Sequence, residues 1–303
     1  SYESQESAQK LVAKMAGYRQ ILRGSRSMMT VMGQMSQSDW QAYVTNLFLG
    51  RDYSGMETVG FAPHVAADRL EVHEKRVRGN AFPDYKVKSS GQGAFFAPVA
   101  RLEASQGLPK GLIGLDLLGE PALAAAMDES ARTGTTVLSA PVVMPDLPGN
   151  PASPAVFMFQ PLYQSASSRP EGLASDATLS KKVSGWVFGA FRVDDMLVKT
   201  LAPLPPNMGL QVFYGSSTAS ASQIYEKHSE LSFSSSSLDQ IEVRVPISLD
   251  GQTWTLQFTG LPRAYTAGQG AVSRDLIAIL MICGLFGVSA VLVAAGLHVG
   301  LGL

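Results

Sequence analysis

The chain has 303 residues, of which 46% are hydrophobic and 16% are charged, and its formal net charge is −1. A charge so close to neutral lacks the basic excess that attracts phosphate backbones, so no nucleic-acid partner is expected. The single cysteine, Cys283, excludes an intrachain disulfide and any site built from several cysteines. The length is sufficient for one or two domains with a substantial core.

Residues 2–35 are predicted to form a long helix. Apolar or small side chains recur there at alternating steps of four and three, which is heptad spacing; they are Leu11, Met15, Tyr18, Leu22, Ser25, Met29 and Met32. The spacing fits a helix that lies on its own domain, and equally a stalk that pairs with a second copy in a homodimer. The sequence Ser-Asp-Trp-Gln at 38–41 reads as a capping box and predicts a second helix to about residue 48.

Short helices and strands are predicted to alternate in the next hundred residues. One helix is expected at 65–76, and another between Pro121, well placed in a first helical turn, and the C-terminal stop Gly134. The predicted strands are 95–99, 112–118 and 135–143.

The second half repeats this mixture after a polar loop at 164–184. A strand at 185–193 leads into a short helix at 194–200, and further strands are expected at 210–214, 241–249 and 253–259. We therefore predict an α+β protein with two lobes in series. The expected parts are stalk helices at 1–50, a first lobe at 51–165, a linker at 166–184 and a second lobe at 185–262.

A long uncharged segment follows the second lobe. Residues 276–297 contain no Asp, Glu, Lys or Arg. About 22 residues at about 1.5 Å of rise per residue match the roughly 30 Å hydrocarbon core of a bilayer. We therefore expect one transmembrane helix at 274–299; the alternative is a buried helix of the core.

The sequence contains no recognisable catalytic or metal-binding motif. Phosphate-binding glycine loops and the GxSxG elbow are absent. His73-Glu74 begins like the zinc motif HExxH, but position 77 is Val77. We therefore expect no enzymatic activity, no metal and no cofactor.

Asp116 is the one carboxylate in an unusual setting. In the predicted strand at 112–118 it shares a face with Gly114 and Leu118, among apolar residues where an unpaired charge would be costly. Its donors could be backbone N–H groups at the start of the next helix, or N–H groups of a bound ligand. Gly114 would leave space beside it for such a ligand.

A series of short motifs occurs in a characteristic order along some 180 residues. They include SQSDWQAYV at 36–44, YSGM at 53–56, GFAPHV at 60–65, FFAPV at 95–99, GLD at 114–116, VLSAP at 137–141, PLY at 161–163 and GWVFGAFRVDD at 185–195. This order resembles the CHASE family, the ligand-sensing ectodomains of receptor kinases and cyclic-nucleotide enzymes.

The resemblance implies a stalk helix carrying two PAS-like lobes, with a small-molecule pocket in the membrane-distal lobe. The soluble part would then lie outside the membrane, in the periplasm of a bacterium. In plant cytokinin receptors of this family an aspartate at the position of Asp116 binds the adenine ring, and Leu138 matches an apolar pocket residue. Phe96 stands where the plant proteins have Tyr, so one hydroxyl contact is lost and cytokinin is not the expected ligand.

Two functions follow from the resemblance. The first is a membrane-anchored sensor that binds a small ligand through Asp116, Leu138, Phe96 and Gly114, and passes a conformational signal across the membrane. A receptor of this kind is expected to continue into a kinase, cyclase or phosphodiesterase domain. The second is an accessory or structural subunit of a larger membrane complex, which keeps the fold without sensing a ligand.

Overall fold

The computed structural model describes residues 2–33, 35–48, 56, 58–89, 91, 93–104, 107–164, 182–201, 203–206, 208–229 and 241–260. They form mixed helix and sheet, as the sequence predicts. Among these described residues, those within 1–204, 210–227 and 243–258 make one compact unit, and those within 205–209, 228–242 and 259–260 belong to a second. None of the described helices is both long and apolar enough to cross a membrane. The predicted span at 276–297 and most of the loop at 164–184 lie outside the described residues.

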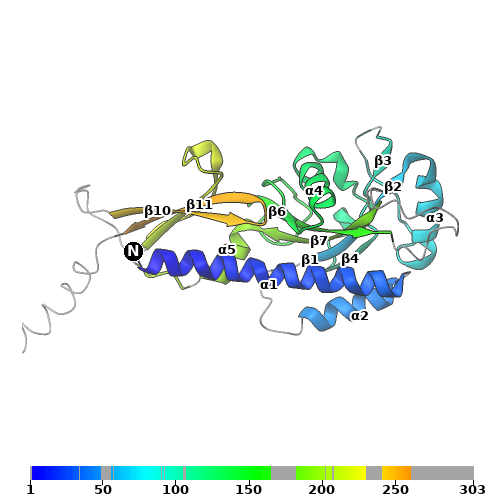
Figure 1. Cartoon of the computed structure of the whole chain (residues 1–303), viewed down its shortest axis with the longest axis horizontal. Coiled ribbons are helices and arrows are strands. Elements are labelled where there is room, and N and C mark those ends of the chain that lie inside the picture. The colour runs from blue at the N-terminus through cyan, green and yellow to red at the C-terminus, as the bar shows by residue number, and fades with distance from the viewer. Residues whose placement is uncertain are drawn as a thin grey trace, which may run out of the picture. The chain divides into compact units, whose positions relative to one another are not determined.

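The predicted N-terminal helix is confirmed as α1, Tyr2–Met32 (Figure 1). The first six heptad positions, Leu11 through Met29, are buried, and Met32 is exposed. This face packs on β6, β7 and α5 of the same chain, and Tyr18 stacks on Phe191 with ring centroids 4.9 Å apart. The helix therefore lies on its own domain, and a homodimer formed through α1 would have to use another of its faces.

The second helix, α2, Gln37–Phe48, begins slightly earlier than expected. Its capping box consists of Ser36 and Asp39, instead of the predicted Ser38 and Gln41. The Asp39 backbone N–H donates to Ser36 Oγ at 3.1 Å, and the Ser36 N–H donates to Asp39 Oδ2 at 3.3 Å. Both exchanges satisfy backbone donors that a helix start leaves without partners.

The first sheet has five strands in the order β4-β1-β7-β6-β5. Each of its neighbouring pairs is antiparallel. The strands are β1, Thr58–Pro63, β4, Arg101–Ala104, β5, Val137–Leu138, β6, Ala155–Tyr163, and β7, Val183–Arg192. Gly60 lies opposite Phe188, where any side chain would collide with the Phe188 ring. That ring packs with Phe157 and Phe159 in a core that α4, Pro121–Thr133, helps to cover.

The second sheet has four strands in the order β10-β11-β8-β9. They are β8, Met208–Tyr214, β9, Gln223–Lys227, β10, Ile241–Leu249, and β11, Gln252–Gly260. Trp254 and Leu256 are fully buried. The predicted helix after β7 is confirmed as α5, Val193–Leu201. Strand β9 lies between the strands predicted at 210–214 and 241–249, at a position where no strand was predicted.

Strand β7 belongs to the first sheet, where it lies between β1 and β6. The sequence predicts that residues 185–193 belong to a second lobe beyond a linker at 166–184. The register joins Phe188 to both Gly60 and Phe159, so strands from both sides of that linker share one sheet. The second sheet takes its strands from residues beyond α5.

The predicted strand at 112–118 is wrong. Residues Lys110–Leu112 and Leu117–Gly119 are short 3-10 turns, and Gly114 between them has φ of +79°. Leu115 and Asp116 form only isolated bridges, on different neighbours. The alternation of apolar residues was correct, but a positive φ turns the chain away from a continuous strand.

Two other predicted boundaries also shift. The helix expected at 65–76 is α3, Leu70–Asn80, preceded by the two-residue strand β2, Val65–Ala66, and a 3-10 turn, Ala67–Arg69. Strand β2 pairs with β3, Phe95–Phe96, so the strand expected at 95–99 is reduced to β3 and a bridge at Pro98. The strand expected at 135–143 is reduced to β5 and a bridge at Val142. The helix between Pro121 and Gly134 is confirmed, with Gly134 in the left-handed conformation.

Arg192, at the end of β7, holds a long loop in place. Its side chain is buried, and its guanidinium donates to backbone carbonyl oxygens of Met144, Pro145, Leu147, Pro148 and Ser153 at 2.7–3.3 Å. A buried cation is costly unless its donors are satisfied. These bonds meet that need and fix residues 144–153 against the sheet.

Replacing Gly114 with Ala should lower the free energy of unfolding by about 1–3 kcal/mol, because alanine disfavours positive φ. The added Cβ would also meet the Lys86 carbonyl oxygen. Gly17→Ala is the matched control: Gly17 lies inside α1 with open space around it, so this change should stabilise by about 0.5–1 kcal/mol. Urea denaturation measures both, and equal effects of the two changes would contradict the assignment at Gly114.

Candidate functional site

Asp116 is held by donors of its own chain. Its side chain is 6% exposed and caps the 3-10 turn Leu117–Gly119. Oδ1 accepts from the backbone N–H of Ala97 at 2.8 Å and of Leu118 at 3.2 Å, and Oδ2 accepts from Ser89 Oγ at 2.8 Å. Of the two kinds of donor considered for Asp116, the structure contains backbone N–H groups, together with one hydroxyl. The Asp116 carboxylate thus connects its own segment to the segments that contain Ser89 and Ala97.

Gly114 and Phe96 lie on segments that adjoin Asp116. The Gly114 N–H donates to Val99, and its carbonyl accepts from Lys88 at 2.8 Å. The missing side chain at Gly114 makes room for the Lys86 carbonyl, so this space is already filled. Phe96 is buried in β3, one residue before the N–H that bonds Asp116.

Leu138 lies on a different part of the first sheet. It is fully buried in β5, opposite Met158 of β6, and its N–H donates to the Asp250 carbonyl at 2.8 Å. The structure therefore brings Asp116, Gly114 and Phe96 together on neighbouring segments, and it places Leu138 against the turn between β10 and β11.

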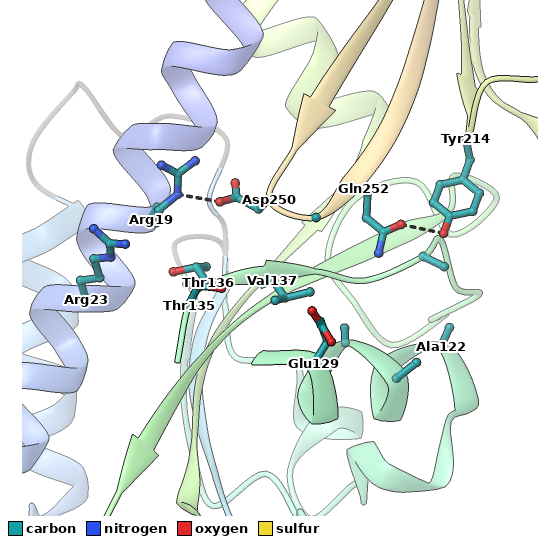
Figure 2. Close-up of a pocket in the computed structure, with 14 residues that line it drawn as sticks. Arg19, Arg23, Ala122, Glu129, Thr135, Thr136, Val137, Tyr214, Asp250 and Gln252 are labelled. Atoms are coloured by element: carbon teal, nitrogen blue, oxygen red, sulfur yellow. Dashed lines mark hydrogen bonds and ion pairs between the residues drawn. The ribbon is translucent and has the colours of Figure 1, made fainter. Parts of the chain in front are cut away.

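A pocket of about 580 Å³ opens beside that turn (Figure 2). We call it the Asp250 pocket. Its wall comes from α1, α4, the segment that contains β5, the end of β8 and the turn between β10 and β11. The lining residues are Arg19, Arg23, Ala122, Ala125, Ala126, Glu129, Thr135, Thr136, Val137, Ala140, Tyr214, Asp250, Gly251 and Gln252.

Asp250 is an almost fully buried acidic residue in the wall of this pocket. Asp250 and Gly251 form a two-residue turn with φ of +44° and +90°, the combination of a type I′ hairpin. The Asp250 side chain is 4% exposed, and Oδ1 accepts from Arg19 Nε at 2.6 Å. Oδ2 is buried and has no hydrogen-bond partner among the described residues. A buried carboxylate oxygen without a donor is costly, so this atom is suited to a donor supplied from outside.

Polar bonds join the turn to the first sheet. Gln252 donates through Nε2 to the Leu138 carbonyl at 2.9 Å and accepts from the Tyr214 hydroxyl at 2.8 Å. With the bond from Leu138 N–H to Asp250, the turn exchanges two hydrogen bonds with one residue of β5. Figure 2 shows Arg19 on α1 pointing at Asp250, and Arg23 further along the same helix. The Asp250 turn is therefore where α1 and β5 both contact the second sheet.

Of the residues that line this pocket, only Val137 and Ala140 belong to a motif noted in the sequence, VLSAP at 137–141. The pair Asp250-Gly251 between two predicted strands is a strong hairpin signal and could have located the turn. Nothing local indicates that Arg19, 231 positions earlier, would be its partner.

A smaller pocket of about 330 Å³ lies beside α3, and His73, Arg76 and Arg101 are among its lining residues. His73 is 3% exposed, and its Nε2 lies 3.0 Å from the Tyr85 hydroxyl. Burial, followed by the nearby charge of Arg76, lowers the pKa of His73 from 6.5 to about 4. His73 is therefore neutral in the folded protein at neutral pH.

The free energy of unfolding should fall as the pH drops from about 7 towards 4. Below pH 6.5 the unfolded chain binds a proton at this histidine, whereas the folded chain does so only near pH 4. The loss attributable to His73 is at most about 3 kcal/mol. Urea denaturation between pH 7 and 4 should show a weaker pH dependence for His73→Gln than for wild type. His228→Gln, at an exposed histidine, is the control, and an unchanged profile in His73→Gln would contradict the assignment.

The Arg19–Asp250 ion pair should show a coupling energy of about 1–3 kcal/mol, because Asp250 is almost fully buried. A double-mutant cycle of Arg19→Gln and Asp250→Asn, followed by denaturation, measures it. The exposed pair Lys10–Glu6 on the same helix is the control, with about 0.3–0.5 kcal/mol expected. Equal coupling energies in the two cycles would show that the buried Asp250 carboxylate gains no more from Arg19 than an exposed ion pair gains.

Comparison with known proteins agrees with the order of motifs in the sequence. The sequence model of the CHASE domain family matches residues 33–225, which is more than half of the chain. The matched range includes the whole of the first sheet and α4. No curated protein matches the chain. CHASE domains are extracellular sensor domains of signalling proteins. Because this match covers more than half of its residues, the chain belongs to the CHASE domain family.

Proposed function

We propose that this chain is the ligand-binding, extracytoplasmic part of a membrane-anchored sensor. In this proposal two PAS-like lobes rest on α1 in the bacterial periplasm, and residues 274–299 cross the inner membrane as one helix. The chain itself catalyses no reaction, and it passes a change of conformation to a signalling partner or output domain. Family membership supports the sensor role, and the Asp250 pocket supports the binding of a small molecule.

The contacts of Asp250 are the observation that carries this proposal. One residue bonds α1 through Arg19 Nε and β5 through the Leu138 N–H. A ligand that changes the partners of Asp250 therefore acts on both elements at once. Such a ligand shifts the balance between two arrangements by the difference in its affinity for them.

Strand β11 connects the pocket, in sequence, with the residues that precede the predicted membrane segment. It begins at Gln252, which lines the pocket, and continues without a break to Gly260. Nine strand residues span about 30 Å. A displacement of the Asp250 turn would therefore move the start of a strand whose other end leads, in sequence, to residues 274–299.

Hydrogen exchange of the full-length protein in lipid nanodiscs tests the proposal. Native mass spectrometry of protein isolated from its own membrane first identifies any retained small molecule. Adding that molecule back to stripped protein should increase amide protection in α1 near Arg19 and along β11, because both contact the pocket. Asp250→Asn should weaken this response, whereas Arg26→Gln, on the same helix but outside the pocket lining, should preserve it.

Two outcomes would contradict the sensor function. Protection confined to the pocket lining would show binding without transmission. Co-purification in a fixed ratio with other membrane subunits, with no retained small molecule, would instead support the accessory-subunit function.

A further inference from the structure

We propose that the Asp250 pocket binds an α-amino acid with an apolar side chain, which inserts its ammonium and carboxylate groups into the Arg19–Asp250 ion pair. This inference rests on the proposed function in one respect, since it takes this pocket as the ligand site of the sensor. It adds the chemical class of the ligand and the contact that the ligand replaces.

The ammonium site follows from Asp250. Asp250 lines the pocket, and its Oδ2 is buried and has no partner among the described residues, so this oxygen requires a donor. A cationic donor suits a buried carboxylate best, because charge-assisted hydrogen bonds are shorter and stronger than neutral ones. The carboxylate is shielded from water, so a ligand reaches it only after a side chain of the wall rotates. Arg19, whose side chain is 33% exposed, has the freedom to do so.

The carboxylate site follows from the two arginines. Arg23 lies one helical turn beyond Arg19, and both line the pocket. The Arg23 side chain makes no ion pair or hydrogen bond among the described residues, and only the Arg23 backbone carbonyl accepts one, from Ser27 Oγ at 3.0 Å. Once Arg19 leaves Asp250, it and Arg23 present two guanidinium groups to a ligand carboxylate. A zwitterion thus replaces one ion pair with two and leaves the net charge of the pocket unchanged.

The remaining wall selects the side chain. Ala122, Ala125 and Ala126 lie on one face of α4, and Val137 and Ala140 add further apolar surface. Glu129, on the same helical face, is already paired with Arg132 at 2.7 Å, so its charge is offset. A wall of small apolar groups in about 580 Å³ leaves room for an aliphatic or aromatic side chain.

Isothermal titration calorimetry of the purified full-length protein tests the ligand class with defined probes. The amino acids are L-alanine, L-leucine and L-phenylalanine. Isopentylamine lacks the carboxylate of leucine, and 2-hydroxy-4-methylpentanoate replaces its ammonium with a hydroxyl. We expect at least one of the amino acids to bind, and both leucine analogues to bind at least about tenfold more weakly than leucine.

Variants locate the site. Asp250→Asn should weaken amino-acid binding by about tenfold or more, and Arg23→Gln should do so by a similar factor. Arg26→Gln, three residues further along α1 and outside the pocket lining, should change it less than about twofold. Arg23 is on the surface of a helix, so Arg23→Gln remains informative even if Asp250→Asn fails to fold.

The possible outcomes separate this inference from the sensor function. Failure of all three amino acids to bind at millimolar concentration, or equal binding of the leucine analogues, overturns the ligand class. The sensor function survives that result if another retained molecule changes protection in α1 and β11. Amino-acid binding that depends on Asp250 but leaves that protection unchanged supports the ligand class and overturns the sensor function.

Discussion

The apolar seam of α1, formed by its buried heptad positions, determines where the side chains that α1 contributes to the Asp250 pocket can lie. Leu11, Met15, Tyr18 and Leu22 are fully buried against β6, β7 and α5, and each contributes about 1.5–3 kcal/mol of hydrophobic stabilisation. Arg19 directly follows one seam residue and Arg23 directly follows another. The positions of both arginines are therefore fixed by core packing, although their guanidinium groups reach the pocket.

The pocket combines this rigid helix with contacts of another kind. Asp250 and Gln252 meet α1 and β5 through hydrogen bonds and one ion pair. Polar contacts of this type can exchange one partner for another at modest cost, whereas a close-packed core cannot. The protein thus places contacts that can change partners between elements that are themselves firmly packed.

The sequence predicted those elements whose signals are local. Pro121 and Gly134 mark the two ends of α4 correctly, and the heptad spacing correctly identified the buried face of α1. Prediction failed where distant segments decide the conformation. The segment at 112–118 alternates like a strand, yet the close approach of the Lys86 carbonyl requires a turn at Gly114.

Contacts between distant segments also explain why the sequence did not predict the partners of Asp116 and Asp250. Asp116 was recognised as a buried carboxylate, but its donors come from Ala97 and Ser89, on other segments of the fold. The ion pair between Arg19 and Asp250 joins the two ends of the described chain. The pair Asp250-Gly251 signals a hairpin turn, but nothing in the local sequence indicates that Arg19 would be its partner, so only the folded arrangement identifies the ion pair.

Arg192 has a consequence for the order in which the protein folds. The loop at 144–153 owes its shape to a guanidinium that lies about forty residues later in the chain, at the end of β7. Before Arg192 is in place, these carbonyl oxygens must find other hydrogen-bond partners, such as water. The loop therefore cannot reach its final conformation before Arg192 has been synthesised, so this lobe cannot be completed earlier on the ribosome.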